Sequence, residues 1–145
     1  MLKVEANQSL LRGGQRIPLA DLHKAAQAAS EAAGKRGSAV SLGFVSEKEI
    51  RRLNVLYRKK DRVTDVLSFE DGEGGRLGEI LICYPQARRQ AEALHHSTRK
   101  EVLFLFVHGF LHLCGFDHEK APGDAARMFS LQARILKRLG IDSRL

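Results

Sequence analysis

The segment that most restricts the fold of this chain is an apolar stretch containing three histidines, His108, His112 and His118. On a helix, His108 and His112 lie four positions apart and therefore project from one face, one turn apart. Gly115 stands where a helix is expected to end in a left-handed conformation, so that the chain can turn back. That reversal can bring His118 to the same point in space. The segment therefore predicts a helix, a sharp turn and three converging imidazoles.

Three imidazoles that converge in this way predict a zinc site whose fourth position stays open for water. Burying such groups without partners would cost about 1–3 kcal/mol each, and either a metal or buried carboxylates could offset that cost. We favour a metal because the third histidine and the intervening glycine fit one arrangement. Nickel or another divalent ion would also accept imidazoles. The chain is therefore expected to be a metal-dependent hydrolase with one Zn2+ per chain.

The spacing is also that of the elongated zinc-protease signature HExxHxxGxxH, with one change. Gly109 replaces the Glu that acts as the general base in such a peptidase. A glycine in mid-helix costs about 1 kcal/mol relative to alanine. Another part of the chain is therefore expected to approach the backbone closely at Gly109, and peptide hydrolysis is disfavoured.

With 145 residues, the chain is most simply one domain over residues 1–145, large enough for a core without metal or disulfide staples. Nothing at the start resembles a signal peptide, and the apolar run over residues 102–116 is too short to span a bilayer. Cys83 and Cys114 are expected to be small buried thiols, and Cys114 is a poor candidate for a ligand because it lies across the helix from His112. A cytoplasmic protein without a membrane partner is predicted.

The positive charge of the chain is large and clustered. The formal net charge is +7, and six cationic residues fall within twelve positions: Arg51, Arg52, Arg58, Lys59, Lys60 and Arg62. Such clustering favours a polyanionic partner, with nucleic acid as the first candidate, although a solvated basic surface would have the same composition. Aromatic residues are few, at 6%. Recognition of backbone and shape therefore fits better than base stacking.

Strand patterns alternate with helical ones along the chain. Strands are expected at residues 2–6, as an edge strand, and at residues 39–45, 66–69 and 77–84, of which the last two are expected to pair as a hairpin. Helices are expected from Pro18 to about Ala33, after Ser46, from Pro85 to about Leu94, from Ser97 through the histidines, and over a final segment that Gly140 ends. This order predicts an α/β (α+β) domain with a small mixed β-sheet of about four strands covered by about five helices.

Two of these helices have more specific sequence signals. Ser46 and Glu49 form a capping box, and the helix after them is expected to turn Ile50, Leu53 and Leu56 inward. The final helix is amphipathic, with an apolar face made of Met128, Leu131, Ile135, Leu136 and Leu139.

Two motifs in the chain match those of a known family. Residues 108–118 follow the pattern HGxLHLxGxDH, and the second motif runs from Leu53-Asn54 through Tyr57-Arg58 to residues 64–69, followed by Gly78-Glu79-Ile80. With these motifs, its length and its element order, the chain resembles the YbeY proteins, bacterial metal-dependent endoribonucleases associated with ribosomal RNA maturation and ribosome quality control. The resemblance covers nearly the whole chain.

The resemblance implies roles for individual residues. It implies that His108, His112 and His118 bind one zinc, and that Arg58 lines the same cleft and contributes to RNA cleavage. We take Arg58 and His112 as the catalytic residues. The chain departs from the family at Glu70, where the family usually has Pro, and at Gln132, where the last helix often carries Glu. The departure at Gln132 puts one contact in doubt, either a contact behind the metal ligands or a packing contact, and neither departure is expected to touch the ligands themselves.

The mechanism expected of such a site is phosphodiester cleavage at a metal with its full formal charge, helped by Arg58, which would grip the non-bridging oxygens. No residue is an evident general base. Asp117 could orient an imidazole or cap the turn. Glu101 and Glu119 are weaker candidates, expected to be solvated or capping residues, and His95 and His96 are expected at the surface. Asp65 and Ser68 could line the cleft or fix the loop that carries Arg58.

Three functions remain open from the sequence. The leading one is a zinc-dependent, single-strand-specific endoribonuclease acting on ribosomal RNA, notably at the 3′ end of 16S RNA, with ribosomal subunits and ribosome-associated proteins as further partners. The second is a different metallohydrolase such as a peptidase, which Gly109 disfavours. The third is an RNA-binding or ribosome-binding assembly factor in which zinc is structural. The open fourth position of a three-histidine site favours catalysis over this third function.

Overall fold

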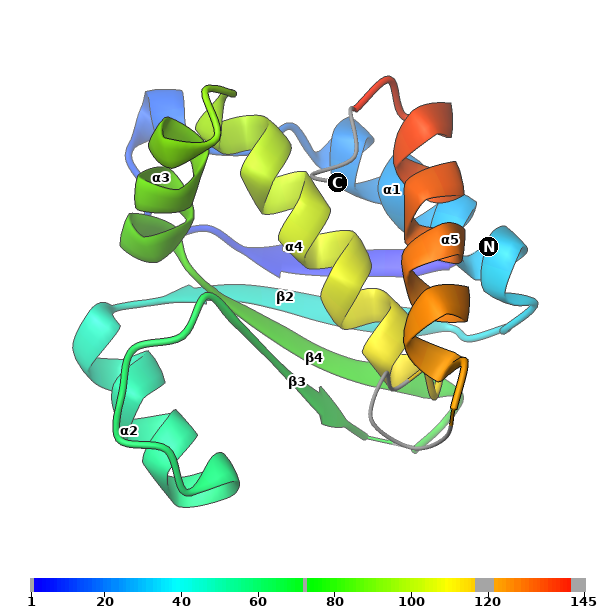
Figure 1. Cartoon of the computed structure of the whole chain (residues 1–145), viewed down its shortest axis with the longest axis horizontal. Coiled ribbons are helices and arrows are strands. Elements are labelled where there is room, and N and C mark those ends of the chain that lie inside the picture. The colour runs from blue at the N-terminus through cyan, green and yellow to red at the C-terminus, as the bar shows by residue number, and fades with distance from the viewer. Residues whose placement is uncertain (1, 72, 117–121, 142–145) are drawn as a thin grey trace.

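Four strands form a single mixed sheet in the computed structural model, which describes residues 2–71, 73–116 and 122–141 (Figure 1). The sheet has the order β1-β2-β4-β3, with β1 at Lys3–Asn7, β2 at Ala39–Val45, β3 at Val66–Glu70 and β4 at Arg76–Cys83. The first three in this order are parallel, and β3 pairs antiparallel with β4. The predicted mixed sheet, the edge position of β1 and the hairpin are confirmed.

Five α-helices accompany the sheet within the described part of the chain. They are α1 at Leu19–Ala33, α2 at Glu47–Arg58, α3 at Tyr84–Ala93, α4 at Thr98–Leu113 and α5 at Asp124–Arg138, with a short 3-10 turn at Gly13–Gln15. The predicted α+β class with about five helices is confirmed. None of these helices is long and apolar enough to cross a membrane.

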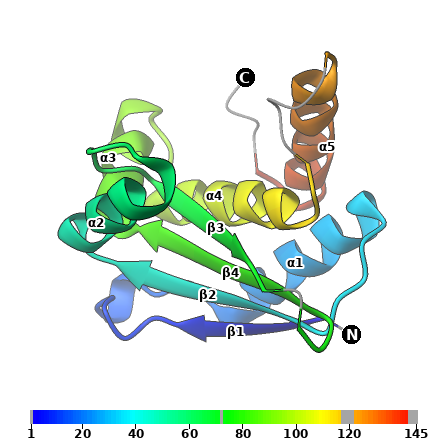
Figure 2. The same ribbon diagram turned by 90° about the horizontal axis from the view of Figure 1, so that it is seen from below.

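The helix α4 crosses one face of the sheet and is the centre of the core (Figures 1 and 2). It packs against β3 and β4 below it and against α1, α3 and α5 around it. The largest fully buried side chains in this layer include Phe106, Phe110, Leu111, Ile80 and Ile82. The helix that carries His108 and His112 is therefore held from several sides, which favours a fixed geometry of this pair.

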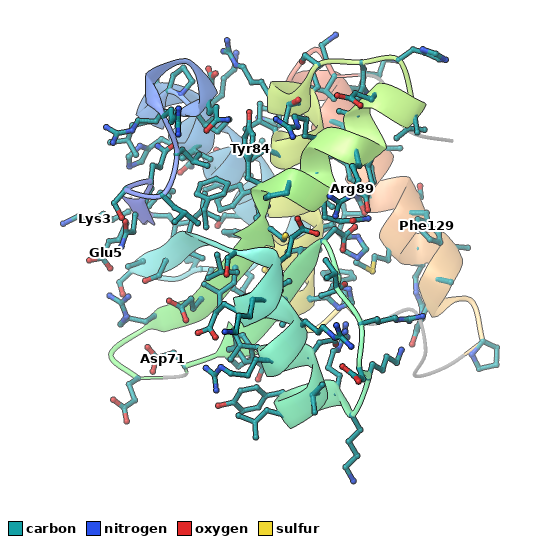
Figure 3. The ribbon with its side chains drawn as sticks, turned by 90° about the vertical axis from the view of Figure 1, so that its left-hand side faces the viewer. Lys3, Glu5, Asp71, Tyr84, Arg89 and Phe129 are labelled. Atoms are coloured by element: carbon teal, nitrogen blue, oxygen red, sulfur yellow. The ribbon has the colours of Figure 1, made fainter. Side chains whose placement is uncertain are left out.

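The helix α2 stands at the end of the sheet where β2 finishes (Figure 1). Ser46 caps it by accepting a hydrogen bond from the Glu49 N–H at 3.1 Å, which is one half of the predicted capping box, whereas the Glu49 carboxylate accepts from Arg52. Its first turn is tied to α3 by an ion pair of 2.9 Å between Glu47 and Arg89, the latter labelled in Figure 3. The last turn of α2, which ends at Arg58, contacts β3 through Tyr57 and Phe69.

The predicted inward face of α2 is partly wrong. Ile50 is fully buried and Leu53 half-buried, but Leu56 is 59% exposed, whereas Asn54 is only 1% exposed. The inward side of α2 is made of positions 50, 53 and 54, which are the i, i+3 and i+4 positions of a helix, whereas Tyr57 is 61% exposed. Leu56 falls beside these positions, because the helix presents Asn54 to the core instead.

Candidate functional site

The two helical histidines meet at their outer ring nitrogens. The Nε2 atoms of His108 and His112 lie 3.1 Å apart, and the ring centroids are 4.7 Å apart. Both side chains are half-buried on one face of α4. The expectation that these imidazoles share a face is confirmed, and their two Nε2 atoms point to one place.

The end of α4 has the predicted left-handed turn. Gly115 has φ of 95°, and its N–H donates to the His112 oxygen at 3.0 Å, while the Phe116 N–H donates to the Leu111 oxygen at 3.0 Å. These two bonds are those of a Schellman motif, which reverses the chain direction after a helix. His118, together with Asp117 and Glu119, lies outside the described residues. Its convergence with the histidine pair therefore stays a prediction, and no group of three metal-binding side chains occurs within the described part of the chain.

The close approach predicted at Gly109 is present. A Cβ atom at this position would lie 2.9 Å from the Ser68 Oγ and 3.0 Å from the Ile80 Cγ2. The Ser68 hydroxyl donates a hydrogen bond to the Gly109 carbonyl oxygen at 3.1 Å. The sheet thus occupies the space that a peptidase Glu would need, so the replacement by glycine is a requirement of packing.

His108 is held by two further side chains. Its Nδ1 donates to the Oε1 of Gln132 on α5 at 3.1 Å, and its ring stacks on Phe104 with centroids 6.4 Å apart and planes 8° apart. Gln132 is 2% exposed. The expectation that Gln132 touches none of the ligands is therefore wrong. In the sequence, Gln132 lies four positions after Met128 and three before Ile135 on the apolar face of α5, and this spacing indicates that its side chain points into the core.

Arg58 lines a small pocket together with the histidine pair. This pocket has a volume of about 150 Å³, and its described lining consists of Arg58, Thr64, Asp65, Val66, Ser68, His108 and His112. The structure therefore brings together three of the predicted site residues, from α2 and α4, and it also places Asp65 and Ser68 there. Arg58 is exposed and has no ion pair with any described carboxylate. Its guanidinium is available to an anion that enters the pocket.

The position of Arg58 is set by contacts on both sides of it in the sequence. Asn54 donates from Nδ2 to the Arg62 carbonyl oxygen at 3.0 Å and so closes the loop that follows α2. Tyr57 packs edge-on against Phe69 of β3, with centroids 5.0 Å apart. Lys59, with φ of 57°, ends the helix directly after Arg58. Asn54 belongs to one of the two family motifs, but its role in closing the loop after α2 can be recognised only from the structure.

Asp65 links the pocket to a partly buried polar network. Its Oδ2 accepts a hydrogen bond from the Gln90 Nε2 at 3.2 Å, and the same amide donates to the Glu101 Oε2 at 2.8 Å. The other Glu101 oxygen lies 2.8 Å from the His96 Nε2. Glu101 is fully buried and the His96 side chain is 18% exposed. The expectation of a solvated or capping Glu101 and a surface His96 is wrong, because α3 and α4 pack together over both.

The chain is similar over most of its length to proteins of one known family. Residues 14–140 match the family described as Endoribonuclease YbeY. The chain belongs to the YbeY family. A relative with that name from Bacillus licheniformis is 43% identical over 143 residues, covering 87% of this chain and 90% of the relative. Another with that name from Aquifex aeolicus is 43% identical over 122 residues, covering 81% of each chain.

A solved structure has a similar fold to this chain. The solution structure of a protein from Thermotoga maritima superposes on this chain with a TM-score of 0.64 at 29% identity, over 96% of this chain and 89% of the other. The resemblance to the YbeY family, first drawn from two motifs, is thus confirmed over nearly the whole sequence.

The thiols of this YbeY-family chain are not suited to metal binding at neutral pH. Burial raises the pKa of the Cys83 thiol, and it raises the pKa of Cys114 to about 11. Cys83 is fully buried as expected, whereas Cys114 is half-buried. A thiol with a raised pKa stays protonated and is a poor ligand and nucleophile.

The histidine pair fits two positions of a zinc ion. Two nitrogens that each lie 2.0–2.1 Å from a tetrahedral zinc are about 3.3 Å apart. The observed distance between the Nε2 atoms of His108 and His112 is 3.1 Å. Two imidazole Nε2 atoms at this distance must share a proton or ligate one cation, because two facing lone pairs repel. The donor set is of the type that zinc prefers.

Proposed function

We propose that this YbeY-family protein is a zinc-dependent endoribonuclease that cleaves single-stranded RNA. Its expected setting is the cytoplasm, where it would act in ribosomal RNA maturation, notably at the 3′ end of 16S RNA, and in ribosome quality control. The observation that carries the proposal is the pocket lined by Arg58 together with His108 and His112, whose Nε2 atoms lie 3.1 Å apart. A cation next to a metal-type ligand pair is the arrangement that phosphodiester cleavage needs.

His108, His112 and His118 are the residues that would hold the zinc. When bound, zinc supplies Lewis acidity toward phosphoryl and water oxygens. Three neutral imidazoles leave the full formal charge of the ion for the substrate. Arg58 would donate hydrogen bonds to the non-bridging phosphate oxygens and stabilise the charge that grows on them in the transition state.

The size of the pocket favours a single strand. Its volume of about 150 Å³ accommodates a phosphate and part of a nucleotide. Ser68 and Asp65, at the β3 side, limit how far a substrate can enter. A phosphodiester held in a stacked duplex would not reach the histidine pair, whereas an unstacked strand can bend into the pocket.

The charges next to the pocket favour RNA as the substrate. Arg58, Lys59, Lys60 and Arg62 form no ion pair within the described part of the chain, whereas Arg51 and Arg52 are paired with Asp61 and Glu49. One cation at the end of α2 and three on the loop that follows it suit the phosphates of a strand that passes across the pocket.

The proposal is tested by measuring zinc content and cleavage of a single-stranded RNA on the same purified samples of wild type, His112→Ala and His95→Ala. His95 is exposed and serves as the matched control. We expect about one zinc and cleavage in wild type and in His95→Ala, and the loss of both in a folded His112→Ala.

A different pattern would support a structural metal. If wild type holds zinc and binds RNA but does not cleave it, and chelation unfolds the protein, the chain is an RNA-binding assembly factor. The structure does not favour the peptidase alternative, because the sheet fills the space beside Gly109 in which a peptidase would have its Glu side chain.

A further inference from the structure

A buried amide on α5 contacts the first histidine of the pair. The Gln132 Oε1 lies 3.1 Å from the His108 Nδ1, and the side chain is 2% exposed. The Nε2 of the same amide is buried and has no hydrogen-bond partner among the described residues. Gln132 is therefore a polar group in the core with one strong contact, and that contact is to a predicted ligand.

The chemistry of this contact fixes where the proton of His108 lies. An amide oxygen can only accept a hydrogen bond, so the His108 Nδ1 must carry the proton. A neutral imidazole then has its lone pair on Nε2, the atom that points to the His112 Nε2 at 3.1 Å. Stacking on Phe104, with planes 8° apart, keeps the ring in this orientation. The acceptor and the stacked ring together direct a lone pair into the pocket.

We propose that Gln132 is a positioning residue, which holds His108 in the Nδ1–H tautomer and so presents its Nε2 lone pair to a metal ion. The inference about the tautomer of His108 is independent of the proposed function. The inference about metal binding rests on the proposed function. Partners of this kind behind a metal-binding imidazole fix its orientation and raise its basicity.

Packing alone does not account for an amide at this position. An apolar side chain of the same length, such as methionine, would fill the space between the neighbouring buried residues Met128 and Ile135 without burying an unpaired N–H group. The contact to His108 explains why a polar side chain stands there. A glutamate would preserve the acceptor oxygen, whereas a methionine would remove it, so Gln132→Glu and Gln132→Met form a matched pair.

The first experiment measures the tautomer of His108 in the metal-free protein, from the nitrogen chemical shifts of its ring. We expect the Nδ1–H form in wild type and in Gln132→Glu, and a mixture or the Nε2–H form in Gln132→Met. The wild-type measurement needs no variant, so it decides the point even if Gln132→Met does not fold. An Nε2–H tautomer in wild type would overturn the inference.

The second experiment measures zinc affinity by competition with a chelator. We expect Gln132→Met to bind zinc about 10–100-fold more weakly than wild type, and Gln132→Glu to bind at least as tightly as wild type. The exposed Gln27 of α1 provides a control, and Gln27→Met should bind as wild type does. Equal affinity in wild type and folded Gln132→Met would overturn the metal part of the inference.

These two experiments separate the inference from the proposed function. If wild type has the Nδ1–H tautomer but binds no zinc, the zinc-dependent function fails and the positioning of His108 stands. If wild type binds zinc and cleaves RNA while Gln132→Met changes neither the tautomer nor the affinity, the function stands and the inference fails.

Discussion

The Ser68 hydroxyl donates a hydrogen bond to the carbonyl oxygen of Gly109 at 3.1 Å and thereby joins β3 to the middle of α4. This carbonyl belongs to the residue between the two histidine-bearing turns of the helix. The contact sets the distance between the sheet and the histidine pair. It is possible only because residue 109 has no side chain.

Gly109→Ala is accordingly expected to destabilise the protein despite the better helix propensity of alanine. The added Cβ would lie 2.9 Å from the Ser68 Oγ and 3.0 Å from the Ile80 Cγ2. Overpacking of this kind costs about 1–3 kcal/mol, against about 1 kcal/mol gained in propensity. Urea denaturation should therefore show a lower free energy of unfolding.

The control for this variant is Gly14→Ala, because a Cβ at Gly14 meets nothing within 4 Å. Its free energy of unfolding should change by no more than about 0.5 kcal/mol. If Gly109→Ala is as stable as wild type, the sheet can move away from α4, and the packing explanation for this glycine is wrong.

Arg58→Ala is expected to reduce RNA cleavage about 10²–10³-fold while leaving the zinc content unchanged. The reason is that Arg58 lines the pocket as a hydrogen-bond donor, whereas the metal is expected to be held by imidazole nitrogens. Single-turnover cleavage of a single-stranded RNA measures the effect. Arg51→Ala, which removes an exposed guanidinium paired with Asp61, is the matched control and should cleave normally. Loss of zinc in Arg58→Ala would instead give this residue a structural role.

The parts of the site that the sequence predicted depend on spacing within one element. The shared face of His108 and His112 follows from four-residue spacing on a helix, and the turn at Gly115 follows from the preference of glycine for positive φ. The close approach at Gly109 could be inferred because a glycine in mid-helix needs a reason. Each of these features depends on residues that are close in the sequence, so it can be predicted without knowing how distant elements pack.

The parts that the sequence missed depend on contacts between distant elements. Gln132 meets His108 because α5 folds back on α4, and Glu101 is buried because α3 packs over the start of α4. A polar residue on a largely apolar face, as Gln132 is, was the available signal. For Glu101 no signal in the sequence distinguishes a capping carboxylate from a buried one, since both occur in the first turn of a helix.

Glu101→Ala is expected to lower the free energy of unfolding by about 2–3 kcal/mol, because it removes the buried carboxylate that accepts from the half-buried Gln90 amide and contacts the His96 ring. Chemical denaturation at neutral pH measures the loss. Glu92→Ala removes an exposed carboxylate from α3 and should change stability little. Equal losses in the two variants would show that the buried network adds no stability.

Cys114 is expected to react slowly with iodoacetamide in the native protein. Burial raises its pKa to about 11, so at pH 8 only about one thiol in a thousand is ionised. In the urea-unfolded chain the pKa returns to about 8.5, and the rate should rise about 100-fold or more. A Cys83→Ala background isolates this thiol, and equal rates in folded and unfolded protein would contradict the prediction.

The raised pKa of Cys114 also predicts how the stability of the protein changes with pH. Because the folded pKa of Cys114 lies above the unfolded one, the folded state holds this proton more tightly. The contribution to stability is complete below about pH 8.5 and is lost as the pH rises toward 11. Cys114→Ala should therefore flatten the fall in stability over this alkaline range, which denaturation at several pH values measures.

The free cations beside the pocket are expected to set the salt dependence of RNA binding. Lys59 and Lys60 form no ion pair within the described residues, and each phosphate contact on a single strand contributes about 0.7 to the slope of log K against log salt. The double variant Lys59→Gln/Lys60→Gln should therefore lose up to about 1.4 of that slope. Fluorescence anisotropy of a labelled RNA, in a His112→Ala background that does not cleave, measures it.

The matched control removes the same amount of charge from cations that are already paired. Arg51 and Arg52 lie 2.7 Å and 2.6 Å from the carboxylates of Asp61 and Glu49. Arg51→Gln/Arg52→Gln should leave the slope near the wild-type value, because paired guanidinium groups release few counterions when RNA binds. If both double variants lower the slope equally, RNA responds to the net charge of the protein, and the loop after α2 is no specific path to the pocket.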